Sequence, residues 1–89
     1  MANKRELKKT IHLVCENLMM ECLAIQDNNP AVAVADIENI AKAILMMQND
    51  FVNRLSHVDK TQTKRFFAQL DEDFAVSTNE VVDMIYQLM

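Results

Sequence analysis

The sequence predicts an all-α protein, an antiparallel up-down-up bundle of three long helices. The 89 residues contain no Gly and only 1 Pro, so the tight turns of a β-hairpin fold lack their usual residues. Hydrophobic residues make up 51% of the chain and recur at helical spacing over three long stretches. Only two short polar segments interrupt this spacing. We therefore expect one helical domain over residues 1–89.

The first helix is expected over residues 4–26. Asn3 can cap it, with Glu6 at the third helical position as in a capping box. One face is apolar at about 100° per residue and is the predicted core face. This face contains Leu7, Ile11, Val14, Cys15, Leu18, Cys22 and Ile25. The far side is apolar as well, with Leu13, Met20, Leu23 and Ala24.

The second helix is expected over residues 30–57, because Asn29 followed by Pro30 fits an N-cap with proline at the first helical position. A later start at Asp36 is the alternative. The predicted core face contains Val34, Ile37, Ile40, Ala41, Ile44, Met47, Phe51, Val52 and Leu55. Gln48 lies near the centre of this face, and a buried amide needs a hydrogen-bond partner. The candidate partners are Thr63, Ser77 and Thr78 on the third helix.

The third helix is expected over residues 61–88, capped by Asp59 or Thr61. Its apolar positions are Phe66, Phe67, Leu70, Phe74, Val81, Ile85 and Leu88. Ser77 and Glu80 match a capping box, which would favour a break in the helix. The apolar spacing stays in phase across this segment, so we expect one continuous helix.

The charge pattern predicts a rod with unlike ends. The chain has 13 acidic and 9 basic residues, a net charge of −4, which argues against nucleic acid as a partner. An up-down-up bundle gathers the basic residues at one end, here called the basic pole: Lys4, Arg5, Lys8, Lys9, Arg54, His57, Lys60, Lys64 and Arg65. The opposite end gathers Glu21, Asp27, Asp36, Glu38, Glu80 and Asp83. Binding of an anionic ligand or of nucleic acid at the basic pole is nevertheless the alternative function.

Cysteine usage and the lack of catalytic motifs predict a cytoplasmic protein without enzymatic activity. Cys15 and Cys22 are about 10.5 Å apart along a helix, too far for a disulfide, and unpaired cysteines fit a reducing compartment. No apolar run reaches the length of a membrane span. His12 and Cys15, with Cys22 on the same face, are the one hint of a metal or redox role, but no second Cys or His pair completes a zinc site. We expect no catalytic residue, no metal and no cofactor.

Two stretches of the chain resemble a known group of proteins. They are Arg5–Ile11 and Gln48–His57, of which the second has the pattern Q-x-D-F-x-x-R-x-x-H. They resemble a group of short, uncharacterised all-helical proteins of Bacteroidetes-type bacteria, in which Asp50, Arg54 and His57 recur. The resemblance implies a helical fold and a bacterial cytoplasmic setting. No activity is assigned to that group, so the resemblance implies no catalytic or binding residue.

Apolar surface is the strongest indication of function. Three slender helices leave much of each helix exposed, so a chain that is 51% hydrophobic should present apolar patches, which favours self-association. We expect a protein–protein interaction module that acts as a homo-oligomer, in the simplest case a homodimer, with another protein as the alternative partner. The candidate interface residues are Leu13, Met20, Leu23, Ala24, Met46, Val82 and Tyr86.

Overall fold

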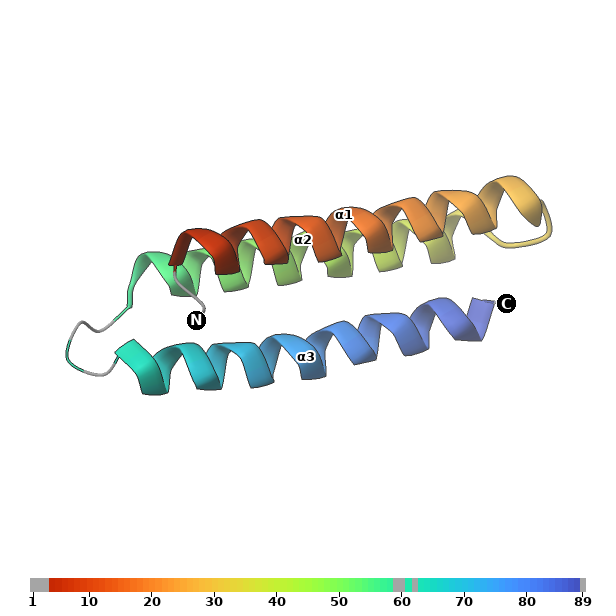
Figure 1. Cartoon of the computed structure of the whole chain (residues 1–89). Coiled ribbons are helices and arrows are strands. Elements are labelled where there is room, and N and C mark those ends of the chain that lie inside the picture. The colour runs from red at the N-terminus through yellow and green to blue at the C-terminus, as the bar shows by residue number, and fades with distance from the viewer. Residues whose placement is uncertain (1–3, 59–60, 62, 89) are drawn as a thin grey trace.

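The computed structural model describes residues 4–58, 61 and 63–88 of the chain. These residues form three helices, α1 (Lys4–Asn28), α2 (Val34–Ser56) and α3 (Thr63–Leu88), which run up, down and up (Figure 1). The predicted all-α three-helix bundle is confirmed. The molecule is a rod of 51 × 19 × 18 Å, so single helices set its length and their side-by-side packing sets its thickness.

The core is a narrow stripe of apolar side chains along each helix. Buried positions recur every three or four residues, which is the period of one helix face. Ile44 has no exposed surface, and Ile11 and Leu55 are each 1% exposed. The buried side chains are Leu7, Ile11, Cys15, Leu18, Cys22, Ile37, Ile40, Ile44, Met47, Phe51, Leu55, Leu70, Phe74, Val81 and Ile85. Because the stripe is narrow, the remaining apolar residues are left at its margins or in solvent.

Helix α2 holds the bundle together. It packs against both α1 and α3, whereas α1 and α3 touch each other at few positions. The rings of Phe51 and Phe74 join α2 to α3 in an edge-to-face contact, with centroids 5.2 Å apart. On the same side of α2, Arg54 forms an ion pair with Asp73 at 3.1 Å. The two outer helices therefore flank α2 and leave space between themselves.

The predicted helix start at Pro30 is wrong because Asn29 caps a turn and not a helix. The Oδ1 atom of Asn29 accepts a hydrogen bond from the N–H of Ala31 at 3.2 Å, and its carbonyl accepts one from Val32 at 3.1 Å. An asparagine that bonds to the backbone two residues later is typical of an Asx-turn. Pro30 therefore lies inside this turn.

Helix α2 begins at Val34, so the alternative start at Asp36 is wrong as well. Ala33 precedes the helix with extended backbone (φ −67°, ψ 134°) and forms no side-chain capping bond. Val34 was expected in the core, but it is 55% exposed, since it is the first helical residue and lies about 60° outside Ile37 and Leu55 around the helix axis.

The other helix ends differ from the prediction by up to two residues. Helix α1 ends at Asn28, and α3 begins at Thr63, with Thr61 in the turn before it. The predicted caps Asn3 and Asp59 lie outside the described residues. Helix α3 passes through Ser77 without a break, as the phase of its apolar positions predicts.

A buried hydroxyl in α3 predicts a stabilising substitution. Among the described residues, the Oγ1 atom of Thr78 is buried and has no hydrogen-bond partner, so the expected pairing with Gln48 is not formed there. An unpaired buried polar atom costs about 1–3 kcal/mol. Thr78→Val keeps the shape of the side chain and removes the hydroxyl, so we expect the free energy of unfolding in urea to rise by about 1 kcal/mol.

The matched control for this substitution is Thr10→Val on the exposed side of α1. Its hydroxyl is already in water, so the change in free energy of unfolding should stay within about 0.5 kcal/mol. Equal effects of the two substitutions would contradict the assignment of an unpaired hydroxyl at Thr78.

Candidate interaction surface

The outward side of α1 is apolar, as the sequence predicts. Leu13 is 58% exposed, Met20 61% and Leu23 54%, and Ala24 is exposed beside them. At about 100° per residue, Leu13, Met20 and Ala24 lie within about 40° of one another, opposite the buried face of the helix. We call these three residues the outer α1 stripe. Leu23 lies about 60° to one side of Met20.

A groove between α1 and α3 adjoins this stripe. Its volume is about 430 Å³. Apolar side chains dominate its walls, and a polar pair from α1 interrupts them. The lining residues are Val14, Asn17, Leu18, Glu21, Val82, Ile85 and Tyr86, and we call this the α1–α3 groove. It exists because α1 and α3 pack on α2 and only sparsely on each other.

The α1–α3 groove contains two of the predicted interface residues, of which one is less exposed than expected. Val82 was expected off the core face, but it is partly buried and packs against the core. Tyr86 is 66% exposed at the edge of the same groove, as predicted. A phenol at the rim of an apolar groove suits an interface, because one end of the ring is apolar and the other can remain hydrated.

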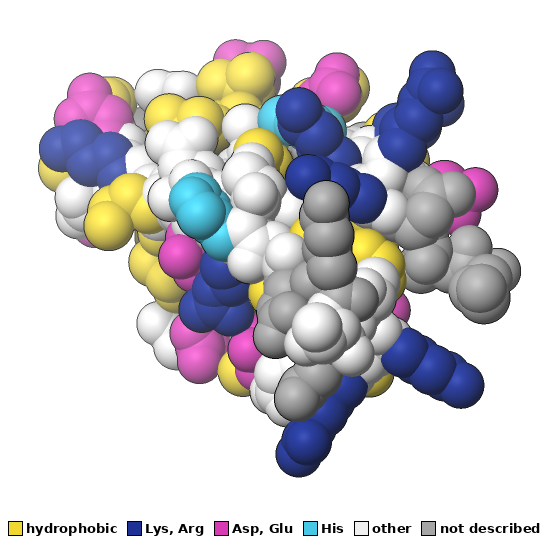
Figure 2. Space-filling view, turned by 90° about the vertical axis from the view of Figure 1, so that its left-hand side faces the viewer, with side chains coloured by type: hydrophobic (Ala, Val, Ile, Leu, Met, Phe, Trp, Pro, Cys, Tyr) yellow, Lys and Arg dark blue, Asp and Glu magenta, His cyan; other side chains and the backbone are white. Residues whose placement is uncertain are grey.

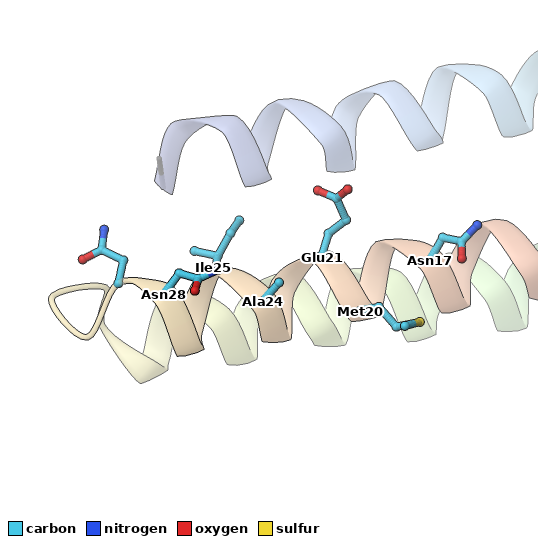
Figure 3. Close-up of a pocket in the computed structure, with 7 residues that line it drawn as sticks. Asn17, Met20, Glu21, Ala24, Ile25 and Asn28 are labelled. Carbon is cyan, nitrogen blue, oxygen red and sulfur yellow. The ribbon is translucent and has the colours of Figure 1, made fainter.

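A second hollow connects the outer α1 stripe to the α1–α3 groove. It has a volume of about 780 Å³ and is lined by Asn17, Met20, Glu21, Ala24, Ile25, Asn28 and Asn29. Figure 3 shows Glu21 and Ile25 pointing from α1 toward α3, while Met20 points away. Asn17 and Glu21 line both hollows. The stripe and the groove therefore form one surface.

Met46 lies apart from this surface. It is 72% exposed on α2 and lines neither hollow. Sequence reasoning also missed Leu45 and Val76, which are half or more exposed on α2 and α3. Isolated exposed apolar residues are normal on soluble proteins. The candidate interface is therefore the α1 side of the molecule and does not extend around it.

The structure brings the basic residues to one end, but they do not converge. Figure 2 looks onto the end where α1 begins and shows Lys and Arg side chains that project in different directions. Lys4, Arg5, Lys8 and Lys9 are exposed on α1, as are Lys64 and Arg65 at the start of α3. Lys60 lies outside the described residues. Among its described residues, the basic pole is thus a solvated end without a cradle in which several donors meet one anion.

Arg54 and His57 of the basic pole have partners within the molecule. Arg54 forms an ion pair with Asp50, four residues earlier in α2, at 3.3 Å and a second one with Asp73 at 3.1 Å, and its guanidinium lies 4.7 Å from the centroid of the Phe51 ring. The second pair was missed, because it depends on the register between α2 and α3. These groups are well exposed, so each ion pair contributes about 1 kcal/mol or less. His57 donates a hydrogen bond from Nδ1 to the carbonyl of Asn53 at 2.9 Å.

The two cysteines are core residues. Cys15 is 2% exposed and Cys22 1%. Burial raises the pKa of both thiols, and the neighbouring Glu21 carboxylate raises the pKa of Cys22 further. Both thiols therefore stay protonated at neutral pH, which makes them weak nucleophiles. His12 is exposed and so points away from the core in which Cys15 lies.

Over residues 4–58, 61 and 63–88, no three His, Cys, Asp or Glu side chains gather closely enough to hold a metal ion. Within the same residues, no helix combines the length and hydropathy needed to span a bilayer.

Comparison with protein-family models, with curated proteins and with solved structures gives no match for this chain.

Proposed function

We propose that this protein is a small helical protein–protein interaction module that acts as a homodimer. Its interface is the outer α1 stripe together with Leu23 and the adjoining α1–α3 groove. One observation carries the proposal: three large side chains, Leu13, Met20 and Leu23, are each more than half exposed on a helix whose other face is already fully used in the core. Burial of an exposed Leu or Met contributes roughly 1.5–3 kcal/mol, so pairing of this surface is strongly favoured.

The proposed setting is the cytoplasm of a bacterium. Free, buried thiols are what a reducing compartment maintains. The module has no chemistry of its own in this proposal; it works by holding another chain. Its shape supports this, since the α1–α3 groove is mostly apolar and adjoins a helix side that is suited to packing against another helix.

The proposal predicts that Met20→Glu combined with Leu23→Lys converts a dimer into a folded monomer. The two charges would have to lose their hydration in an apolar interface, which is costly even where Glu and Lys three residues apart form an ion pair. The measurement is molar mass by light scattering on a sizing column over a range of concentrations. The unchanged protein should have twice the chain mass of 10.2 kDa, and the double variant should have the mass of one chain with unchanged helical circular dichroism.

The matched control is Met46→Glu combined with Val76→Lys. Both residues are more than half exposed but lie outside the proposed interface. This variant should remain a dimer. A double variant at Met20 and Leu23 that stays dimeric, or an unchanged protein that is monomeric at every concentration, would refute the proposal.

A further inference from the structure

Helix α1 carries a charge gradient along its length. Its first turns contain Lys4, Arg5, Lys8 and Lys9 against Glu6, a local charge of +3. From residue 10 to residue 28 the helix has no Lys or Arg and contains Glu16, Glu21 and Asp27, a charge of −3. The other helices extend this polarity at the far end of the rod, where Asp36, Glu38, Glu80 and Asp83 lie.

Four residues place this gradient in line with the apolar stripe. At about 100° per residue, Lys9, Leu13, Met20 and Asp27 lie within about 40° of one another around the α1 axis. All four are exposed. Along the helix, these four positions are positive, apolar, apolar and negative. The exposed Glu16 lies beside them, about 20° from Lys9 and Asp27, and approaches its own counterpart in either orientation of a dimer, so it does not distinguish the two. Two such rows have complementary charges only when one helix runs antiparallel to the other.

We infer that the second copy docks antiparallel, with its α1 laid along α1 of the first copy. This inference rests on the homodimer proposed above. In this arrangement Leu13 faces Met20 of the other copy, and Lys9 faces Asp27 of the other copy. Because a two-fold interface is isologous, each of these contacts occurs twice.

The spacing of the row is compatible with this pairing. The midpoint of Leu13 and Met20 is position 16.5, so Lys9 lies level with position 24 of the other copy, three residues or about 4.5 Å along the helix from Asp27. The long, flexible lysine side chain spans that offset. The two-fold axis then passes near Asn17. A parallel dimer would instead place Lys9 against Lys9 and Asp27 against Asp27, which is repulsive in both places.

Charge reversal distinguishes the two orientations. The dissociation constant of the dimer is measured by sedimentation equilibrium at low salt for Lys9→Glu, Asp27→Lys and the two combined. In the antiparallel dimer each single reversal turns two attractive pairs into repulsive ones, so each should weaken the dimer by about tenfold. The combined variant exchanges the charges and should recover most of the affinity. Lys42→Glu, on the exposed side of α2, is the control and should leave the constant unchanged.

Other results overturn the inference. In a parallel dimer Lys9→Glu replaces one like-charge pair by another, and Asp27→Lys does the same, so neither single reversal would change the dissociation constant appreciably. Single reversals without any effect would mean that the two residues do not face each other. If the unchanged protein is monomeric at all concentrations, the homodimer itself fails, which is a different result from a dimer of the wrong orientation.

Cross-linking tests the orientation without relying on charge. Lys9→Cys and Asp27→Cys proteins are mixed and treated with a flexible bismaleimide, which joins thiols that are too far apart for a disulfide, while the buried native thiols stay protected. The antiparallel dimer predicts cross-links between the two proteins. Cross-links that join only Lys9→Cys to itself, or the absence of any cross-link in a sample shown to be dimeric, would overturn the inference.

Discussion

Phe51→Ala is expected to lower the free energy of unfolding by about 3–5 kcal/mol. Phe51 is 2% exposed and lies where α2 meets α3. Its ring packs edge-to-face with that of Phe74, with centroids 5.2 Å apart. The guanidinium of Arg54 lies 4.7 Å from the centroid of the Phe51 ring. Truncation leaves a cavity and removes both contacts at once. Since small domains are stable by only about 5–15 kcal/mol, this loss is a large share of the total.

The measurement is urea denaturation followed by circular dichroism, with Phe66→Ala as the matched control. Phe66 is also an aromatic residue of the bundle, in edge-to-face contact with Phe67, but it is only partly buried near the start of α3. Its truncation should cost about half as much, because less apolar surface is involved. Equal losses would show that Phe51 is not the main contact between α2 and α3.

The core of this protein is readable from the sequence because one helical period runs through each helix. Leu7, Ile11, Ile44 and Phe74 are buried where the phase of the apolar residues places them. The same reasoning fails for Val34, which lies about 60° outside Ile37 and Leu55 around the α2 axis and is the first residue of the helix. Val52 has the same angle but lies inside α2, where it is partly buried against the core, so a residue at the margin of the face is covered within the helix and not at its end.

The sequence does not determine the structure of the turn before α2, because the pair Asn29–Pro30 is compatible with two local conformations. Asn29 followed by Pro30 fits a helix cap, but it fits an Asx-turn as well. In both cases the side-chain oxygen accepts a hydrogen bond from a nearby N–H. The structure contains the turn, with the bond from Ala31. Whether the cap or the turn forms depends on the path of the chain from α1 to α2, and the local sequence does not determine that path.

Half of the candidate surface was predictable. Leu13, Met20 and Leu23 are exposed because each lies more than a quarter turn from the buried face of α1. The α1–α3 groove was not predictable, since it depends on how far apart the two outer helices stand. Val82 shows this limit: its phase indicates the margin of α3, but only the packing shows that it is partly buried in the groove wall.

Ala43→Pro is expected to lower the free energy of unfolding by about 3 kcal/mol or more. Ala43 lies in the middle of α2, the helix that packs against both others. Proline there removes one intrahelical hydrogen bond, and its ring clashes with the carbonyl four residues earlier. The resulting kink shifts the apolar stripe of α2 on one side of the break, so contacts with both neighbouring helices are disturbed.

Val34→Pro separates a position effect from any general effect of proline in α2. Position 34 is the first helical residue, whose N–H has no acceptor within the helix, and Ala33 already has the extended backbone that proline requires of the residue before it. This substitution also restricts the unfolded chain, so it should raise the free energy of unfolding by about 0.4–1 kcal/mol. Both variants are compared by urea denaturation. A loss at Val34→Pro similar to that at Ala43→Pro would mean that α2 does not begin where the structure places it.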